Sequence, residues 1–309
     1  MTERINLLVT GGCGFIGSNF INYIFNKNTY KIINIDNLYY CANIDNVDKH
    51  IQCSPYYTFI KGNICSKDLI QHVLINYKIN IIIHFAAQSH VDTSFDSSLE
   101  YTKDNVLGTH NLLDAIKNTN PQIFLLHFST DEVYGESISG DDVKTENSIL
   151  IPTNPYSASK AAAEMFVSAY IKSYSIRCII ARCNNVFGLN QYHEKVIPKF
   201  HKQIREGGKC TIHGNGKHIR NFIHVSDVCR AVCIMIHKGK LGEIYNISGN
   251  IEMSVLDLAE KIVKDYYGKD VDPSLYIEFV ENRPFNDNRY NINSDKLEQL
   301  GWNVQVSKL

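Results

Sequence analysis

The most constraining feature of the sequence is a glycine-rich loop between an apolar run and an amphipathic, helix-like run. Residues 5–10 are almost entirely apolar, and Gly11, Gly14 and Gly17 follow at three-residue intervals. Glycines at this spacing let backbone N–H groups approach a pyrophosphate at a helix N-terminus, where the helix dipole favours negative charge. The loop therefore predicts the first strand–helix–strand unit of a dinucleotide-binding fold.

An acidic residue stands where such a fold places one. A second strand-like run at residues 31–35 ends at Asp36, which lies about 20 positions after the last glycine, as expected for a carboxylate on the adenosine ribose hydroxyls. Such a carboxylate would repel a 2′-phosphate. The sequence therefore predicts NAD rather than NADP as the cofactor.

A tyrosine and a lysine share one face of a later predicted helix. Tyr156 and Lys160 are four positions apart in the Ala-rich run 155–173, which begins with Pro155. Lowering a phenol pKa from about 10 to about 7 takes roughly 4 kcal/mol. A lysine ammonium at about 4 Å supplies roughly that energy at an effective dielectric near 20. A lone pair of this kind also occurs in ordinary surface helices, so it gains weight only from the glycine loop.

Two carboxylates follow another apolar run. Residues 123–128 read as a buried strand, so Ser129, Thr130, Asp131 and Glu132 are expected just past its carboxyl end. Open α/β sheets bind ligands at this edge. Because residues 131 and 132 would point to opposite faces of a straight strand, the chain must bend there for both to reach one ligand.

The rhythm of the chain indicates the fold class. Strand-like runs near 5–10, 31–35, 57–60, 80–84, 123–128, 177–181 and 244–247 alternate with helical runs at 14–26, 66–77, 103–118 and 155–173. This pattern predicts an α/β protein with a Rossmann-type doubly wound parallel sheet and a smaller C-terminal substrate-binding lobe. We expect residues 1–182 to form the NAD-binding domain, with elements near 225–250 returning to it. Residues 183–309 should mainly form the substrate-binding lobe.

At this point the chain resembles a known family. From about Ile5 to Trp302 it is similar to the extended short-chain dehydrogenase/reductases, specifically the nucleoside-diphosphate-glucose 4,6-dehydratases. Thr130-Asp131-Glu132 is the specific mark, because related epimerases and decarboxylases share the loop and the Tyr/Lys pair but differ there. Further matching stretches are 84–92, 105–113, 184–188, 194–198, 213–217 and 282–290.

The resemblance implies a division of chemical roles. Tyr156, supported by Lys160, would take the proton of the glucose 4-hydroxyl while NAD⁺ accepts hydride from C4, and Thr130 would hydrogen-bond the oxyanion. Glu132 would then remove the C5 proton. Asp131 would protonate the departing 6-hydroxyl, which requires burial or the neighbouring carboxylate to raise its pKa above about 3.9.

The resemblance also implies the remaining binding residues. The cofactor would contact Gly11, Gly14, Phe15, Ile16, Gly17, Asp36, Asn37, Asn63, Ile64, Ala86, Tyr156 and Lys160. The substrate would contact Ser89, Asn185, Lys195, Arg220 and Arg283, of which the three cations suit a diphosphate or its base. No metal site is expected. Asn63 departs from the family, which usually has an aspartate facing the adenine amine, although an amide carbonyl can still accept that hydrogen bond.

Several alternatives remain open. An NAD-dependent nucleotide-sugar epimerase or decarboxylase would need only Tyr156, Lys160 and the cofactor. A non-catalytic NAD-binding regulator would typically have lost one of that pair. Residues 38–43, 87–88 and 282–287 resemble the eukaryotic-type enzymes that act on UDP-glucose at the start of UDP-rhamnose synthesis, so UDP-glucose is favoured over dTDP-glucose.

Composition adds limits rather than a function. The net charge of −1 and the lack of a basic tract give no support for a nucleic-acid or membrane partner. Nine cysteines without a C-x-x-C pair fit free thiols in a reducing cytoplasm. The resemblance implies a homodimer formed through the helices at 103–118 and 155–173. The final Ser-Lys-Leu matches a peroxisomal address, which we expect to be a coincidence.

Overall fold

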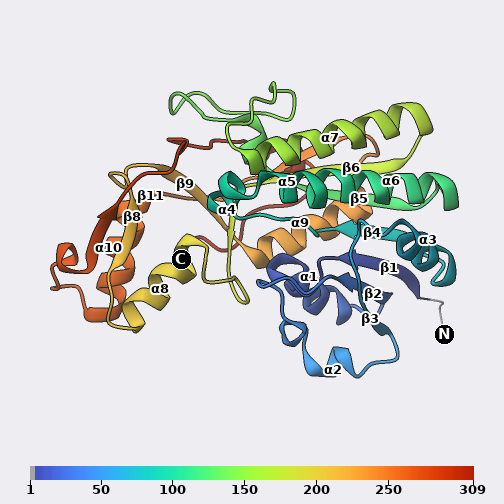
Figure 1. The fold of residues 1–309 in the computed structure, drawn as a ribbon, viewed down its shortest axis with the longest axis horizontal. Helices are drawn as coiled ribbons and strands as arrows, with labels where there is room; N and C mark the ends of the chain where they lie inside the picture. Colours follow the sequence, from blue (N-terminus) through green and yellow to red (C-terminus); the bar gives the residue numbers. More distant parts are fainter. Residues whose placement is uncertain (1–3) are drawn as a thin grey trace.

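A seven-stranded parallel sheet organises the larger part of the chain (Figure 1). The computed structural model describes residues 4–309. In the spatial order β10-β6-β5-β4-β1-β2-β3, the direction of the chain across the sheet reverses between β1 and β4, where such folds bind ligands. The strands are β1 (Ile5–Thr10), β2 (Tyr30–Asp36), β3 (Tyr57–Lys61), β4 (Ile81–His84), β5 (Phe124–Thr130), β6 (Arg177–Cys183) and β10 (Ile244–Ile247).

Helices cover both faces of this sheet (Figure 1). Neighbouring strand residues explain why, since Leu7 belongs to one hydrophobic cluster and Leu8 to the other. Successive apolar residues of a strand therefore pack into hydrophobic clusters on opposite faces of the sheet. One face carries α1 (Phe15–Phe25) and α9 (Val225–Lys238); the other carries α3 (Lys67–Asn76), α6 (Gly108–Thr119) and α7 (Pro155–Tyr174).

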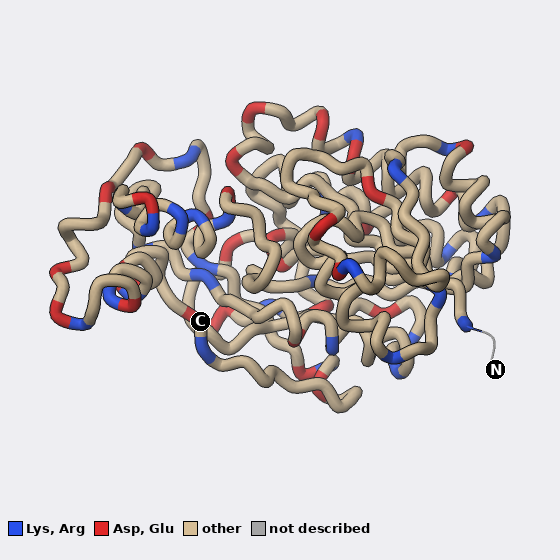
Figure 2. Tube along the Cα trace, turned by 90° about the horizontal axis from the view of Figure 1, so that it is seen from below, with Lys and Arg blue, Asp and Glu red and all other residues tan. Residues whose placement is uncertain are grey.

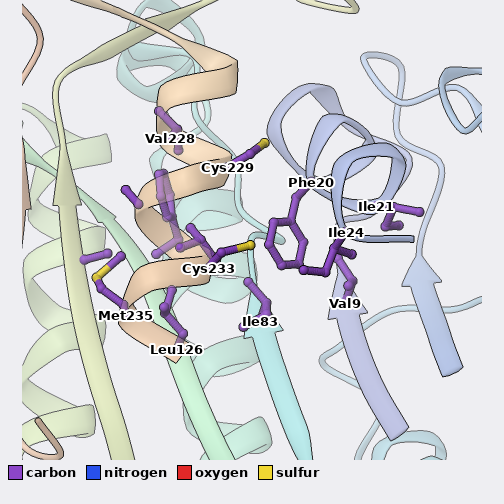
Figure 3. Close-up of a cluster of buried hydrophobic side chains, with 14 of the residues drawn as sticks. Val9, Phe20, Ile21, Ile24, Ile83, Leu126, Val228, Cys229, Cys233 and Met235 are labelled. Carbon is purple, nitrogen blue, oxygen red and sulfur yellow. The ribbon is translucent and has the colours of Figure 1, made fainter. Parts of the chain in front are cut away.

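The α1 and α9 face shows how distant segments form one core. Figure 3 shows Phe20 and Ile24 of α1 and Cys233 of α9 pointing into the space between the two helices. All three side chains are buried, as is Ile83 on the strand below. Cys233 is a free thiol and therefore acts as a small apolar residue in this core.

The remaining strands and helices build the smaller lobe and the connections. One sheet has the order β11-β9-β7 and another pairs β12 with β8, and a separate hydrophobic cluster lies between them and α8 and α10. The lobe comprises β7 (Asn185–Phe187), β8 (Cys210–His213), β9 (Ile219–His224), β11 (Ile251–Ser254), β12 (Ile277–Val280), α8 (Val196–Arg205) and α10 (Val255–Tyr267). Short helices are α2 (Lys49–Gln52), α4 (Val91–Asp96), α5 (Ser98–Tyr101) and α11 (Asp295–Glu298).

The elements largely match their sequence predictions, with one local surprise. The predicted helix at 103–118 begins as a π-helical turn, Thr102–Leu107, before continuing as α6. The turn carries Asp104 and Asn105, both buried. Helix α9 and strand β10 return the chain to the large sheet. The division of the chain into two domains at residue 182 stays a prediction.

Charges are spread over the whole trace. Figure 2 shows acidic and basic residues interspersed along both the large sheet and the smaller lobe. No helix within residues 4–309 is both long enough and apolar enough to cross a bilayer.

Candidate active site

A cavity of about 310 Å³ opens at the carboxyl ends of the large sheet's strands, against the smaller lobe. It is lined by the glycine loop, the ends of β2, β4 and β5, the start of α7 and the segment that leads into α8. All twelve candidate cofactor residues line it: Gly11, Gly14, Phe15, Ile16, Gly17, Asp36, Asn37, Asn63, Ile64, Ala86, Tyr156 and Lys160.

The glycine loop leaves room and N–H donors for an anion. Gly11 has φ +72°, and a Cβ there would lie 2.7 Å from the backbone of Ala86. A Cβ on Gly17 would lie 2.2 Å from the Gly11 carbonyl oxygen, so this turn can form only without side chains. Gly14 caps α1 without a side-chain hydrogen bond, and the first turn of the helix holds no acidic residue. The N-terminal N–H groups of α1 are thus left for a ligand.

Asp36 is fixed at the end of β2. Its Oδ2 accepts a hydrogen bond from Cys13 N at 2.9 Å, and its Oδ1 accepts one from Leu38 N at 2.8 Å. Burial raises the pKa of the Asp36 carboxyl, and these backbone hydrogen bonds act against that rise. Each oxygen keeps a further lone pair, so the carboxylate can still accept hydrogen bonds from a ribose.

Asn63 lies in the same cavity but already uses its carbonyl. Its Oδ1 accepts a hydrogen bond from Cys65 N at 2.8 Å, which closes a turn after β3. One lone pair of that oxygen remains for another donor. The expected contact with an adenine amine therefore stays a prediction.

The predicted bend between the two carboxylates is confirmed. Thr130 ends β5 and caps a 3-10 turn, Asp131–Tyr134, that is closed by Gly135 at φ +72°. The turn replaces the strand's alternation of faces, so Asp131 and Glu132 line one cavity. Sequence prediction ended the strand at residue 128, two residues before the structure ends it.

Asp131 is buried and held by neutral groups. Its Oδ2 accepts a hydrogen bond from Asn184 Nδ2 at 2.6 Å, and its Oδ1 accepts one from the Thr130 hydroxyl at 3.2 Å. Burial, followed by the nearby Glu132 carboxylate, raises the pKa of Asp131 to about 7. An acid with such a pKa can hold a proton near neutrality and still release it.

Glu132 has one strong partner. Its Oε2 accepts a hydrogen bond from Asn154 Nδ2 at 3.1 Å, while the Asn154 Oδ1 accepts one from Ser157 N and caps α7. Burial raises the pKa of Glu132, and the Asn154 hydrogen bond opposes that change. The cap of α7 thus also fixes the Glu132 carboxylate beside Tyr156.

Tyr156 and Lys160 lie together on α7. The expectation that the pKa of Tyr156 is lowered was wrong for the protein without its ligands. Burial, and then the Glu132 carboxylate, raises the pKa of Tyr156. Burial also lowers the pKa of Lys160 to about 8, and its Nζ donates to the Phe128 carbonyl at 2.7 Å. The calculation from charge alone left out desolvation, which raises the pKa of Tyr156, and Lys160 directs its Nζ to the Phe128 carbonyl.

The five candidate substrate residues divide into two groups. Ser89, Asn185 and Lys195 line the cavity, and Lys195 Nζ donates to the Ser89 carbonyl at 2.5 Å. Arg220 and Arg283 do not line it. Arg220 donates to the Asp287 carbonyl and to Asn286 Oδ1, both at 2.9 Å, and Arg283 is paired with Asp92. The place of both arginines in a diphosphate site therefore stays a prediction.

Sequence reasoning missed two amides that hold the carboxylates. Asn154 precedes Pro155, and an Asn before a Pro is an N-cap signal that could have drawn attention to it. Asn184 offers no such local signal, because its partner Asp131 lies in a distant segment, the turn after β5. His84 is buried between the hydroxyls of Thr10 and Thr109, at 2.7 and 3.0 Å from its ring nitrogens. Within residues 4–309, no group of His, Cys, Asp or Glu has the arrangement of a metal site.

Comparisons with known proteins agree on the family. The model of the GDP-mannose 4,6 dehydratase family matches residues 8–308. A human dTDP-D-glucose 4,6-dehydratase is 43% identical over 97% of this chain and 85% of its own length. The crystal structure of dTDP-glucose 4,6-dehydratase DesIV from Streptomyces venezuelae, with NAD and TYD bound, superposes with a TM-score of 0.93 at 35% identity. That alignment covers 98% of this chain and 93% of DesIV.

Plant relatives are longer. A trifunctional UDP-glucose 4,6-dehydratase/UDP-4-keto-6-deoxy-D-glucose 3,5-epimerase/UDP-4-keto-L-rhamnose-reductase from Arabidopsis thaliana is 47% identical over 98% of this chain. The chain spans only 45% of the length of that relative. Because the family model and the human relative match almost from end to end, the chain belongs to the nucleoside-diphosphate-glucose 4,6-dehydratases of the extended short-chain dehydrogenase/reductase family.

Proposed function

We propose that this protein is an NAD-dependent hydro-lyase that converts UDP-glucose, or dTDP-glucose, to the 4-keto-6-deoxy-glucose nucleotide and water. One observation carries the proposal. Asp131, with a pKa of about 7, and Glu132 share a cavity with Tyr156. Dehydration needs an acid for the departing oxygen and a base for the neighbouring carbon, and this turn provides both.

The residues present fit NAD. The glycine loop and the uncapped start of α1 suit a pyrophosphate, and the Asp36 carboxylate suits ribose hydroxyls rather than a 2′-phosphate. When bound, NAD supplies a reversible hydride carrier and the positive charge of its oxidised nicotinamide. Such a charge favours the Tyr156 phenolate, which burial alone disfavours.

The first step removes the proton of the sugar 4-hydroxyl. Tyr156 accepts this proton at its phenolic oxygen, and the Thr130 hydroxyl donates to the oxygen that becomes a carbonyl. Lys160, held by the Phe128 carbonyl, keeps a positive charge near the phenolate. Ser129 is not available to help, because its hydroxyl donates to Glu164 Oε1 at 2.5 Å.

The second step eliminates water. A carbonyl at C4 acidifies the C5 proton, which Glu132 removes, and Asp131 gives its proton to the departing 6-oxygen. Asn154 and Asn184 keep the two carboxyl groups in place. Glu132 later returns its proton to C5 when hydride reaches C6, so the sugar is rearranged without net oxidation.

Incubation of the purified protein with NAD and each nucleotide-linked glucose tests the proposal. A 4-keto-6-deoxy product absorbs characteristically after alkali treatment, and we expect it to appear. Absence of product with every nucleotide tested would refute the dehydratase function. A 4-epimer in place of the keto sugar would instead support the epimerase alternative, which the Asp131–Glu132 pair disfavours.

UDP-glucose is the proposed nucleotide sugar. The matching stretches at 38–43, 87–88 and 282–287 support it. The plant relative named for UDP-glucose is 47% identical, against 43% for the human relative named for dTDP-glucose. Competition between the two substrates at equal concentration should favour UDP-glucose, and a large preference for dTDP-glucose would contradict this choice.

A homodimer through α6 and α7 is also proposed. Leu99, Leu107 and Met165 lie on or beside these helices and are 82%, 52% and 54% exposed. A contiguous partner helix face would bury them. Light scattering at micromolar concentration should give twice the mass of the chain, and a monomeric mass would contradict the proposal.

The cytoplasm is the proposed location. The nine cysteines, all within residues 4–309, are free thiols, which suits a reducing compartment. Fusion of the last residues to a fluorescent reporter tests this location, and peroxisomal puncta would refute it.

A further inference from the structure

A carboxylate of the smaller lobe reaches the turn before α7, outside the candidate active site. Asp287 lies in the segment after β12 and is 2% exposed, although it does not line the cavity. Both of its carboxylate oxygens lie within hydrogen-bonding distance of the Thr153 hydroxyl, at 2.9 and 2.8 Å. Its Oδ2 also accepts from the Tyr290 hydroxyl. A hydroxyl has a single proton, so the proton of Thr153 is committed to this carboxylate.

The segment that carries Asp287 is fixed to the smaller lobe. Ile219 N on β9 donates to the Asn288 carbonyl at 2.7 Å, and Arg220 Nη1 on the same strand donates to the Asp287 carbonyl at 2.9 Å. Arg220 is only 9% exposed, so its hydrogen bond is shielded from water. Asp287 is therefore tied to β9, while its side chain holds the turn before α7.

Thr153 is adjacent to the residue that holds the proposed base. Its neighbour Asn154 caps α7 and donates through Nδ2 to Glu132 Oε2 at 3.1 Å. Two residues before Thr153, Ile151 N donates to the Val133 carbonyl at 3.1 Å, so this segment lies along the turn that carries Glu132. A displacement of Thr153 would therefore move the Asn154 amide and, with it, the Glu132 carboxylate.

The proposed reaction needs the base and the sugar to be aligned, and our inference rests on that proposed function. The smaller lobe would hold the nucleotide diphosphate, whereas Glu132 stands in the turn after β5 of the large sheet. A misplacement of about 1 Å between reacting groups can cost roughly 10²-fold in rate. A direct link from the lobe to the base would let the binding energy of the nucleotide orient the base.

We propose that Asp287 is a positioning residue, which acts through Thr153 and Asn154 to align the Glu132 base with a sugar nucleotide bound to the smaller lobe. Because neither Asp287 nor Thr153 lines the cavity, both act on the reaction through Glu132. Burial raises the pKa of Glu132, and the charge of Asp287 adds to that rise. The same carboxylate thus also makes Glu132 a stronger base.

Rapid mixing of Thr153→Val holoenzyme with substrate tests this link. Valine keeps the shape of the side chain and loses the hydroxyl, so NADH should appear at the wild-type rate, because Tyr156 and Lys160 are unchanged. Removal of the C5 proton should slow by roughly 10-fold, a fraction of the loss that a 1 Å misplacement can cause.

Two readouts report on that step. NADH should persist longer in Thr153→Val than in the wild-type protein. The isotope effect of substrate deuterated at C5 on product formation should increase, because proton removal becomes the slower step. Thr153→Ser keeps the hydroxyl and should restore both values. A hydroxyl that only stabilises the fold would leave the isotope effect unchanged.

A double-mutant cycle shows whether Asp287 and Thr153 act as one unit. Asp287→Asn leaves one carbonyl oxygen for two hydroxyl donors, so it should also slow C5 proton removal. The two substitutions together should cost no more than the larger single one. Thr119→Val is the matched control, because that hydroxyl donates to the Ala115 carbonyl at 2.7 Å on α6, and its rates should equal those of the wild-type protein.

The outcomes separate the link from the proposed function. If the wild-type protein forms no keto sugar, the function fails. If it forms the product, the link is refuted by any of three results: Thr153→Val delays NADH as much as product, its isotope effect equals that of the wild-type protein, or the losses in Thr153→Val and Asp287→Asn are additive.

Discussion

Two buried carboxylates, Glu164 outside the cavity and Asp131 in its lining, differ in their partners. Glu164 on α7 is fully buried, and Arg182 on β6 binds it through Nε at 3.1 and 3.0 Å and Nη2 at 2.6 Å. Asp131 is almost as buried, yet no Lys or Arg side chain in the described chain forms a salt bridge with it. A paired carboxylate serves the fold, whereas an unpaired one is free to exchange a proton.

Adjacent hydroxyls on β5 follow the same division. Ser129 donates to Glu164 on one face of the sheet, and Thr130 donates to Asp131 at the cavity. Successive strand residues point to opposite faces, so one step along the chain separates a structural network from the reacting groups.

The largest expected effect comes from removing a carboxylate of the cavity. Glu132→Gln keeps an oxygen for Asn154 but removes the base, so product formation should fall by roughly 10²–10⁴-fold. Incorporation of solvent deuterium at C5, measured by mass spectrometry, should fall in parallel. Glu136→Gln is the matched control, because that side chain only accepts from Asn288 N and a Gln still can. Equal losses in both variants would contradict the role of Glu132.

Loss of the Glu164–Arg182 pair should change the stability of the protein rather than its chemistry. Arg182→Met leaves Glu164 buried and unpaired, which should lower the free energy of unfolding by about 3–5 kcal/mol. Urea denaturation measures this change. Arg182→Met combined with Glu164→Gln should recover much of the loss, because no buried charge remains. A loss under about 1 kcal/mol in the single variant would show that the pair does not hold the fold.

A smaller effect concerns the cost of keeping Asp131 unpaired. Its pKa rises from 3.8 to about 7 on folding. The folded protein therefore keeps a proton that the unfolded chain has released, so its stability falls as pH rises from about 4 to about 7 and is level above. Asp131→Asn removes this dependence and should be the more stable protein at pH 8, by on the order of 4 kcal/mol. Identical pH profiles of unfolding for both proteins would contradict the shifted pKa.

The pattern of the chain was sufficient for the elements and for most of the cavity. The glycine loop, Asp36, and the Tyr156–Lys160 helix face depend on local spacing, which sequence shows directly. The bend at Asp131 followed only from the roles that the resemblance implies, because two carboxylates on a straight strand cannot meet one ligand, and no sequence signal marked it.

What the sequence could not show depends on contacts between distant segments. Glu164 and Arg182 come from different elements, and nothing in either segment marks them as partners. The raised pKa of Tyr156 follows from desolvation, a property of the packed site. Arg220 was predicted from the resemblance to the family, whereas its partner, the Asp287 carbonyl, is set by the fold of the smaller lobe.

The most direct test of the central claim compares Asp131→Asn with Tyr156→Phe in rapid mixing with NAD and substrate. An amide cannot give the proton that the departing 6-oxygen needs, but Asp131→Asn keeps Tyr156, Lys160 and the cofactor site. It should therefore accumulate NADH, seen by absorbance, while product formation falls by roughly 10²–10⁴-fold. Tyr156→Phe should show neither NADH nor product. Wild-type turnover by Asp131→Asn, or failure of both variants before any NADH forms, would contradict the assignment of Asp131 as the dehydration acid.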